Sequence, residues 1–367
     1  MWKELALLLA GLLGLLFSEL GGFVVAVRKC AQVKPPQSSS RENPPLLFLA
    51  VSDMHVLGSK RSSLDVQWTT WQLRKSLYLF SKIIQPDVVL GLGDHLDQGG
   101  YATDEEWVWY VQRYRWATGD LQRNVLIVDS VIGNHDAQFA NMGMTLSMLQ
   151  RFETEFGNSN GVLRIGSIEV IWINSLALDA AEGSKARQDI EEHLAKLSNR
   201  TGDDHDVTFR ILLSHVPLHR PNDLGCGKTR LREGAHVTYV APAEPLVVGS
   251  DVLSEASSQR LLSTIRPNLV LAGHLHTQCY RQVSWAQEQA NDTRYLEMTV
   301  PTLSYRMRPD PGFTVFMVDG QTLSGKTCKL PHEQSLIFAD LFSVALSFVG
   351  IGSIIFRVRQ DSKNKAE

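Results

Sequence analysis

The sequence predicts an α/β domain with a largely buried sheet, and an apolar segment near each end of the chain. Short apolar runs rich in β-branched residues alternate with amphipathic helical patterns, which is typical of βαβ units. The 367 residues are 44% hydrophobic, enough to bury one large core or two small ones. The formal net charge of -3 provides no basic field, so we expect no nucleic-acid partner.

The first apolar segment, Leu5–Val27, is long enough to cross a bilayer, for which about 20 apolar residues suffice. Glu19 and two glycines interrupt it. A cleaved signal peptide with its apolar region at Leu5–Phe17 is therefore an alternative to an uncleaved anchor within residues 1–29. We expect a Pro- and Ser-rich spacer at residues 30–45, between this segment and the domain.

The second apolar segment, Ser335–Phe356, is followed by a basic tail, residues 357–367, which belongs in the cytosol under the positive-inside rule. The N-terminal flank disagrees, because three basic residues follow the first segment and only Lys3 precedes it. The C-terminal bias is larger, and the N-glycosylation sequons at Asn199 and Asn291 also favour a lumenal domain. Cleavage of the first segment would leave the domain lumenal as well.

Lys363 and Lys365 lie at the fifth and third positions from the end of the chain. This spacing resembles the KxKxx signal by which coat proteins return membrane proteins to the endoplasmic reticulum. The alternative is that the two lysines only end a basic stop-transfer flank. The retrieval interpretation implies that coat proteins bind the tail.

The domain, residues 46–330, contains six apolar runs with the length and β-branched content of buried strands. These runs are Leu46–Ser52, Asp87–Leu92, Asn124–Ile132, Glu169–Asn174, Thr208–Leu213 and Asn268–Ala272. Amphipathic patterns between them predict helices. The predicted helices are Thr70–Ile84, Asp104–Ala117, Met144–Phe156, Ala186–Leu197 and Ser254–Ile265.

Polar side chains follow five of the six predicted strands. In chain order they are Asp53, Asp94, Asn134, His215 and His274. Ligands of open α/β sheets bind outside the carboxyl ends of the strands, so we expect these side chains to converge on one edge of the sheet. A chance scatter of Asp and His would not select the strand ends.

Two further imidazoles, at His55 and His276, belong to the same set, because each lies two residues after a strand-end residue and points to the same side of an extended segment. The seven candidate ligands are Asp53, His55, Asp94, Asn134, His215, His274 and His276. Oxygen and imidazole donors without a thiolate suit Mn, Fe or Zn. Two such ions about 3.5–4 Å apart can clamp a phosphorus centre and generate hydroxide at neutral pH. The sequence therefore predicts a two-metal phosphoesterase.

The neighbours of the ligands suggest further roles. Asp94 can bridge two ions with its two oxygens, and Asp97 is expected to orient a ligand or nearby backbone. His135 can protonate a leaving oxygen or hold a phosphate oxygen, because an imidazole titrates near neutral pH. Asp136 is expected to fix either the tautomer of His135 or the turn. His95 points away from Asp94 in an extended segment, so we expect it to be structural or to lie at the rim of the site.

Loop residues near the metal motifs are candidates for substrate contacts. They are His219, Arg220, Tyr305 and Arg306. Four cysteines, Cys30, Cys226, Cys279 and Cys328, form no CxxC pair, so a structural zinc is not expected. The sequence leaves room for one disulfide among the last three cysteines, without fixing its connectivity.

The order D-x-H, GD-x-x-D, GNHD, H and G-H-x-H resembles that of the calcineurin-like metallophosphoesterase superfamily, from Leu46 to about Phe316. The resemblance implies two packed mixed β-sheets flanked by helices, and two divalent ions bridged by Asp94. It assigns Asp53, His55, Asp94 and His276 to one ion. It assigns Asp94, Asn134, His215 and His274 to the other ion. It also implies that His135 is the general acid.

The two terminal helices, the segments VSDMHVLG and SHVPLHR and the KxKxx tail resemble the endoplasmic-reticulum members of this superfamily that remodel GPI anchors. This narrower resemblance implies Mn-dependent removal of ethanolamine phosphate from the second mannose of GPI-anchored proteins. It also implies cycling between the endoplasmic reticulum, the intermediate compartment and the cis-Golgi. The alternatives are another lumenal metal-dependent phosphomonoesterase, and a non-enzymatic cargo adaptor for export, although no ligand position has been lost.

Overall fold

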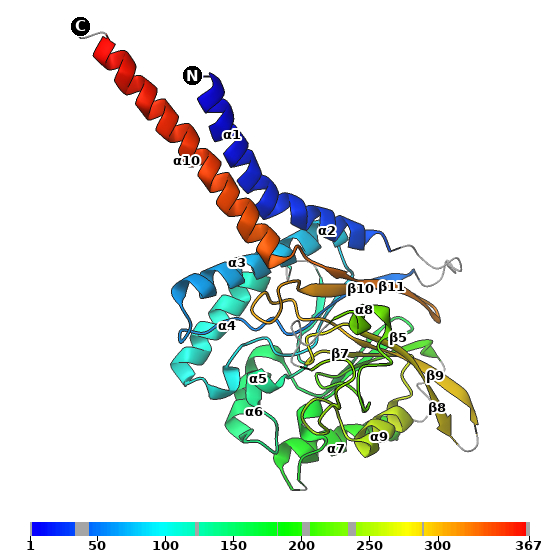
Figure 1. Cartoon of the computed structure of the whole chain (residues 1–367). Helices are drawn as coiled ribbons and strands as arrows, with labels where there is room; N and C mark the ends of the chain where they lie inside the picture. Colours follow the sequence, from blue (N-terminus) through cyan, green and yellow to red (C-terminus); the bar gives the residue numbers. More distant parts are fainter. Residues whose placement is uncertain are drawn as a thin grey trace.

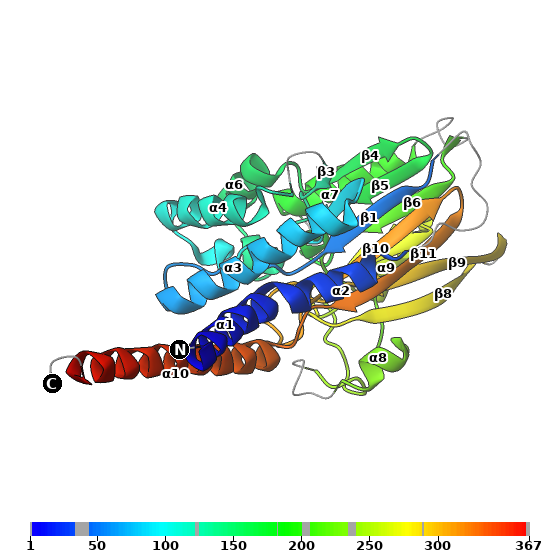
Figure 2. The same ribbon diagram turned by 90° about the horizontal axis from the view of Figure 1, so that it is seen from above.

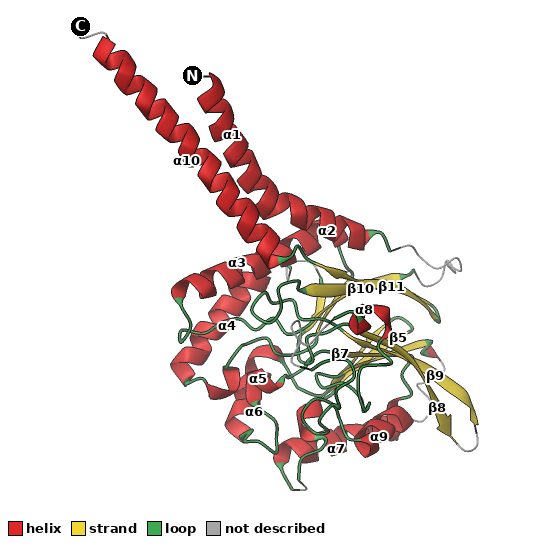
Figure 3. Ribbon diagram, in the orientation of Figure 1, coloured by secondary structure: helices red, strands yellow, loops and turns green. Residues whose placement is uncertain are grey.

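The computed structural model describes residues 2–33, 44–121, 125–181, 183–199, 206–233, 240–287 and 290–364. In these residues, two β-sheets lie at the centre of a domain and helices cover its outside (Figure 3). Two long helices project together from one side of the domain, with both chain termini at their far ends (Figure 1).

The first sheet has the strand order β11-β10-β1-β2-β3. Its strands are β1 Leu46–Val51, β2 Val88–Gly91, β3 Leu126–Val128, β10 Gly312–Asp319 and β11 Thr322–Lys329. The strands β1, β2 and β3 are parallel, whereas β10 runs antiparallel to both β1 and β11. The sheet is therefore mixed.

The second sheet has the order β4-β5-β6-β7-β9-β8. Its strands are β4 Gly161–Ile165, β5 Ile168–Trp172, β6 Phe209–Leu213, β7 Leu269–Ala272, β8 Cys279–Gln287 and β9 Ala290–Thr299. The strands β5, β6, β7 and β9 are parallel, and the two edge strands are antiparallel to their neighbours. This sheet is mixed as well.

The two sheets pack face to face. Phe48 and Ala50 of β1 share one buried cluster with Ile211 and Leu213 of β6, from the other sheet. The alternate residue of β1, Leu49, belongs to a second cluster that the helices cover. Side chains alternate between the two faces of a strand, so β1 contributes to both layers. The two packed mixed sheets flanked by helices are as the family resemblance implies.

Seven helices of the domain are described, and a Ser or Thr side chain caps the start of five of them. The seven are α3 Ser63–Leu79, α4 Asp104–Thr118, α5 Asn134–Ala137, α6 Leu146–Phe156, α7 Lys185–Ser198, α8 Gly227–Leu231 and α9 Glu255–Ile265. The five capped helices are α3, α4, α6, α7 and α9. The Thr103 side chain accepts a bond from the amide of Glu106, whose carboxylate accepts from Thr103, and this capping box starts α4. Ser62 caps α3 in the same position, so α3 begins seven residues before the predicted start at Thr70.

All six predicted strands are present, with bounds that differ by a few residues. Five strands were not predicted: β4, β8, β9, β10 and β11. Most of these lie at sheet edges or pair as hairpins, and β11 is only half-buried. The polar strand β11 is held by backbone pairing more than by burial of an apolar run, so composition marks it weakly, whereas β10 is a buried apolar run that was missed.

The N-terminal segment forms α1 Trp2–Leu16, a π-helical turn at Phe17–Gly21 and α2 Gly22–Ala31. Helix α10, Glu333–Asn364, forms the C-terminal segment. Both segments are long and apolar enough to cross a membrane, with a mean hydropathy of 2.0. Helices α1 and α10 run side by side, and α2 turns onto the domain (Figures 1 and 2). Most of the predicted spacer, residues 34–43, lies outside the described residues.

Small residues form the contact between α1 and α10. An ideal Cβ placed on Gly11 would lie 2.6 Å from the carbonyl oxygen of Ser343, and one on Gly350 would lie 2.9 Å from the amide of Leu8. Close backbone approach at small residues is a common way for helices to associate in membranes. At the end away from the domain, Glu4 and Arg357 form an ion pair of 2.9 Å.

Two disulfides are present: one lies among the last three cysteines, as the sequence allowed, and a second, through Cys30, was not expected. Cys30 at the end of α2 bonds to Cys328 of β11, and Cys226 bonds to Cys279 at the start of β8. The first links residues 298 positions apart. The sequence could not indicate the Cys30–Cys328 bond. Cys30 directly follows the first apolar segment, and that segment was expected to be an anchor separate from the domain.

Candidate metal centre

The segments that carry the candidate ligands meet between the two sheets. They follow β1, β2 and β3 of the first sheet and β6 and β7 of the second. The sequence alone suggested convergence on the edge of one sheet. The strands that carry the ligands instead belong to two sheets, and the carboxyl ends of these strands face the same place. Oδ1 of Asp53 and Nε2 of His276, 223 positions apart in the chain, therefore lie 3.5 Å apart.

Backbone strain is concentrated at these positions. Five candidate ligands have a left-handed backbone conformation that non-glycine residues rarely adopt. They are Asp53 (φ 52), His55 (φ 43), Asp94 (φ 52), His274 (φ 70) and His276 (φ 58). Each such residue costs about 1–3 kcal/mol, and such residues cluster where function requires an unusual side-chain direction.

Two glycines allow the segments to approach each other. Gly93 has φ 89, and an ideal Cβ there would lie 2.7 Å from Nδ1 of His215. A Cβ on Gly133 would lie 2.8 Å from Cγ of Asp94. Any larger residue at either position would push the ligand segments apart.

The first group of donors consists of Asp53, His55, Asp94 and His276, all buried, with one donor atom of each within 4.8 Å of the others. The Nε2 atoms of His55 and His276 are 3.1 Å apart. Nε2 of His55 is also 3.5 Å from Oδ2 of Asp94. This is the set that the resemblance assigns to one ion.

The second group consists of Asp94, His215 and His274, again within 4.8 Å of one another. Nε2 of His215 lies 3.4 Å from Oδ2 of Asp94 and 3.0 Å from Oδ1 of Asn134. Asn134 contributes a neutral oxygen, so this group carries less negative charge than the first. The set matches the one that the resemblance assigns to the other ion.

Asp94 links the two groups. Its Oδ1 accepts a bond of 2.8 Å from the amide of His135, whereas its buried Oδ2 has no hydrogen-bond donor among the residues that the structure describes. That oxygen lies between Nε2 of His55 and Nε2 of His215. A buried carboxylate oxygen without a donor is costly, and a cation on each side of it would satisfy it. The residues present therefore fit a pair of metal ions.

Carbonyl groups set which nitrogen each histidine offers. Nδ1 of His215 lies 2.8 Å from the carbonyl oxygen of Leu92, and Nε2 of His274 lies 2.7 Å from that of Ser250. A carbonyl can only accept, so these nitrogens carry the hydrogens. His215 therefore presents Nε2, and His274 presents Nδ1, to a metal.

The electrostatics of the site favour cations. Burial lowers the pKa of His274 to about 4, so its imidazole is neutral with a lone pair available at neutral pH. Burial has the same effect on His215, but the Asp94 carboxylate outweighs it and raises the pKa of His215 to about 9. The carboxylates thus attract positive charge to the position that an ion would occupy.

The residues around the ligands have distinct roles. Nδ1 of His135 donates to the carbonyl oxygen of Asp97 over 2.6 Å, which leaves Nε2 of His135 free of a protein partner. The Asp97 carboxylate lies 3.6 Å from Nδ1 of His55 and orients that ring. Asp136 accepts from the amides of Leu96 and Gly133, both at 3.0 Å. Asp136 therefore fixes the turn and does not set the tautomer of His135.

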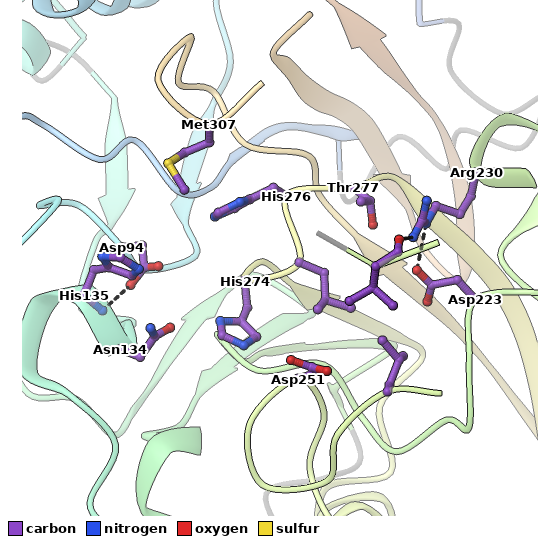
Figure 4. A pocket seen from close by; sticks show the side chains of 13 residues that line it. Asp94, Asn134, His135, Asp223, Arg230, Asp251, His274, His276, Thr277 and Met307 are labelled. Carbon is purple, nitrogen blue, oxygen red and sulfur yellow. Dashed lines mark hydrogen bonds and ion pairs between the residues drawn. The ribbon is translucent and has the colours of Figure 1, made fainter. Parts of the chain in front are cut away.

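A cavity of about 270 Å³ opens onto the two groups (Figure 4). Asp94, Asn134, His135, His274 and His276 form one side of it. The sequence did not indicate the residues of the remaining walls. These include Asp223, Arg230, Leu246, Asp251, Thr277 and Met307. They belong to loops outside the motifs, and only the position of Thr277 directly after His276 was a signal.

Buried ion pairs stiffen the wall opposite the ligands. Arg220 and Arg230 both donate to the Asp223 carboxylate, over 2.8 and 2.7 Å. Arg308 donates to Glu233 and to the carbonyl oxygen of His276, both over 2.9 Å. Breaking a buried pair costs about 3–5 kcal/mol, so these contacts hold the wall in place.

The candidate substrate contacts are not where the sequence suggested. Arg220 is paired in this wall, and Tyr305 is buried, with its hydroxyl donating to the carbonyl oxygen of Pro331. His219 and Arg306 do not line the cavity either. His95 packs against Phe152 and Phe156 and lies 2.8 Å from the carbonyl oxygen of Asp129, so its role is structural, which was one of the two expectations.

The family profile and the sequence relatives agree with this site. The profile of the calcineurin-like phosphoesterase family matches residues 46–278. Metallophosphoesterase 1 of Mus musculus is 29% identical over 361 residues, which cover 92% of this chain and 85% of the relative. Metallophosphoesterase 1 of Danio rerio is 30% identical over 310 residues, covering 80% and 77%. A solved purple acid phosphatase from yellow lupin (Lupinus luteus) seeds has a TM-score of 0.47 and 15% identity, covering 80% of this chain and 52% of its own.

The family match includes every candidate ligand, from Asp53 to His276, and the relatives match over most of both chains. The two packed sheets, the paired donor groups and the bridging position of Asp94 form a dinuclear metal-binding site of the kind that hydrolyses phosphate esters. The chain is a metal-dependent phosphoesterase and belongs to the calcineurin-like phosphoesterase family.

Proposed function

We propose that this chain is a phosphodiesterase that removes ethanolamine phosphate from the second mannose of GPI anchors, and so promotes export of GPI-anchored proteins. The observation that carries the metal-dependent phosphoesterase part is Oδ2 of Asp94, which is buried between two imidazole nitrogens and has no donor among the described residues. The GPI part rests on the similarity to metallophosphoesterase 1, which extends over 92% of the chain and so includes parts outside the family domain.

The seven candidate ligands would hold two divalent ions, in the two sets given above. When bound, such ions neutralise charge on the phosphate and activate water as a nucleophile. Mn is the metal that the resemblance favours, whereas the donor types also suit Fe or Zn. Neutral Asn134 limits the negative charge of the site, which suits an anionic substrate.

His135 would protonate the mannose oxygen as it leaves. Its Nδ1 is held by the carbonyl of Asp97, so Nε2 is the atom that can deliver a proton. His135 lines the cavity beside Asp94 and Asn134, where a leaving oxygen would lie (Figure 4). The Asp94 carboxylate favours the protonated ring and, although burial opposes it, the pKa of His135 is raised.

The size of the cavity supports a small headgroup. Pockets for small molecules usually measure about 300–1,000 Å³, and this cavity of about 270 Å³ is at the lower end. It suits a phosphoethanolamine group and part of one sugar, with the rest of the glycan outside. Asp251 lines the cavity and could accept a bond from the ammonium group of ethanolamine.

We infer that α1 and α10 cross the membrane of the endoplasmic reticulum, with the domain in the lumen and the tail in the cytosol. The contact of α1 with α10 through Gly11 and Gly350 supports a retained first helix rather than a cleaved signal peptide. Lys365 lies outside the described residues, and Lys363 lies near the end of α10. Coat proteins would bind these two lysines during cycling through the intermediate compartment and cis-Golgi.

Purified full-length protein loaded with Mn provides the test. It should release ethanolamine phosphate from GPI-anchored protein, as detected by mass spectrometry of the glycan, and Asp94→Asn should abolish the release. Preference for a phosphomonoester over a diester would favour the phosphomonoesterase alternative. Normal GPI export in cells that carry only the Asp94→Asn form would favour the cargo-adaptor alternative instead.

The location has a separate test. Replacing Lys363 and Lys365 by Ser should move the protein from the endoplasmic reticulum towards later compartments, as seen by imaging. An unchanged distribution would show that these lysines only end a basic flank.

A further inference from the structure

One face of α3 is apolar, although it is exposed. Leu64, Trp71 and Tyr78 are 80%, 48% and 44% exposed, and they recur at intervals of seven residues, so they lie along one side of the helix. Soluble surfaces seldom carry large apolar side chains in such a row, and rows of this kind usually mark a contact surface. We call these three residues the α3 stripe.

The stripe is continuous with the base of the two long helices. Nε1 of Trp71 donates to the Glu19 carboxylate over 3.2 Å, and Nζ of Lys75 forms an ion pair of 2.7 Å with the same group. Phe17 and Leu20, in the same turn as Glu19, are 69% and 40% exposed. Figure 1 shows α3 on the side of the domain from which α1 and α10 leave, and α6 farther from these two helices, below α4 and α5.

A groove beside the stripe has matching chemistry. It has a volume of about 500 Å³ and lies between α3 and α4, lined by Gln67, Trp109, Gln112, Arg113 and Trp116. Guanidinium groups lie over both tryptophan rings: Arg113 over Trp109 at 4.6 Å, and Arg74 over Trp116 at 4.5 Å. Tryptophan and tyrosine favour the interface between lipid and water, and cations there face lipid phosphates.

We propose that the α3 stripe and the α3–α4 groove rest on the lumenal leaflet of the bilayer, with the apolar side chains among the lipid headgroups. This inference rests on the proposal that α1 and α10 cross that bilayer. Lipid is the occupant because the stripe extends the surface that the two helices expose to the membrane. A protein partner would have to share this position with the headgroups.

The contact would fix the position of the cavity relative to the membrane. The ring of Tyr305 packs against Phe23 of α2 and Trp68 of α3, with centroids 6.3 and 5.4 Å apart. Met307, two residues further along the same loop, lines the cavity. The disulfide from Cys30 to Cys328 fastens α2 to the first sheet. The domain can therefore hold its cavity at a constant height above lipid-linked substrates.

A labelled cysteine tests the contact without reference to catalysis. All four native cysteines form disulfides, so Leu64→Cys or Tyr78→Cys adds a single free thiol for an environment-sensitive fluorophore. The full-length protein would be reconstituted in phosphatidylcholine vesicles that contain a lipid with a nitroxide near its headgroup. Leu146→Cys is the matched control, because Leu146 is an exposed leucine in the first turn of α6.

Probes at positions 64 and 78 should shift to the blue and be quenched by the nitroxide lipid, and the probe at position 146 should show neither effect. Equal responses at all three positions would overturn the proposal. A change in the fluorescence of these probes that appears with a soluble binding protein, but not with the lipid, would also overturn the proposal.

An activity measurement adds the functional consequence. Leu64→Glu should lower the hydrolysis of a GPI substrate in the same vesicles by about tenfold, because a charge replaces an apolar contact. It should leave hydrolysis of soluble bis-p-nitrophenyl phosphate unchanged, as should Leu146→Glu. An unchanged rate on the vesicle substrate would contradict the proposal. Inactivity of the wild type on both substrates would instead contradict the proposed function, and the probe result would still decide the membrane contact.

Discussion

At the scale of single residues, one oxygen atom organises the site. Oδ2 of Asp94 is buried and has no donor in the described part of the chain, while Oδ1 is fixed by the amide of His135. The hydrogen bond to Oδ1 thus fixes the Asp94 carboxylate, and Oδ2 remains available to bind metal ions. Its neighbours divide the remaining work: Asp136 holds the turn, and Asp97 orients His55.

His135→Ala should separate proton transfer from metal binding. We expect turnover of a diester with an alkyl leaving group to fall by about 10²–10³, because the alkoxide then leaves unprotonated. A p-nitrophenyl diester, whose leaving group needs no proton, should lose far less. Bound metal should stay at the wild-type amount, measured by elemental analysis. Equal losses on both diesters would remove His135 from the general-acid role.

Asp310 should contribute to the acid sensitivity of the fold. Burial opposes its charge, but Lys329 at 2.5 Å and Arg308 at 2.8 Å outweigh burial and lower its pKa below the usual 3.8. A lowered pKa stabilises the fold above the ordinary value, and this contribution is lost as the pH falls through the folded pKa. Asp310→Asn should therefore lower the melting temperature at neutral pH but not well below pH 3.8. A pH-independent difference would contradict this account.

The seven candidate ligands lie in short local motifs after buried strands, and the structure brings their donor atoms together, whereas ligation of a metal by them stays a prediction. The sequence could not predict Asp223, Arg230 or Asp251, because these reach the cavity from loops with no pattern of their own. The suggested contacts from Arg220 and Tyr305 were wrong for a related reason. Proximity to a motif in sequence does not say whether a side chain turns into the core, and both are buried.

At the scale of elements, burial decided what could be predicted. Strands β1, β2, β5, β6 and β7 are almost fully buried and were visible as apolar runs. The polar strand β11 depends on its pairing with β10, which no local pattern announces. The disulfides also depend on tertiary structure, since the fold brings Cys226, just before α8, to Cys279 at the start of β8.

The Cys226–Cys279 disulfide should stabilise the cavity wall. Replacing both cysteines by Ser should lower the free energy of unfolding by about 2–4 kcal/mol, measured by urea denaturation. It should also raise KM for a small diester, because Asp223 and Arg230 flank Cys226 in the wall. The matched variant without the Cys30–Cys328 bond should lose stability but keep its KM. A change in KM in both variants would argue against a local effect.

The contact between α1 and α10 should depend on small residues. Gly11→Leu would force the helices apart and should cost about 1–3 kcal/mol, seen as a lower melting temperature in detergent. Gly352 faces open space on α10, so Gly352→Leu is the control and should be neutral. Equal effects of the two substitutions would show that the helices do not pack through this seam.

At the scale of the whole molecule, two sheets and two terminal helices serve one site. The ligand segments, distant in the sequence, come together at the carboxyl ends of strands from both sheets. The strand pattern predicted this convergence at the edge of a single sheet, whereas the family resemblance implied two packed sheets. The sequence predicted α1 and α10 as apolar segments. It did not predict α2 as a separate helix, because the apolar residues Phe23 and Val27 of α2 continue the first apolar segment. Helix α2 connects the two terminal helices to the catalytic domain.

Anomalous scattering from crystals grown with Mn tests the central claim most directly. We predict two ions about 3.5–4 Å apart, with Asp94 in contact with both, and loss of at least one ion in Asp94→Asn. A single ion, or two ions bound away from Asp94, would contradict the dinuclear site.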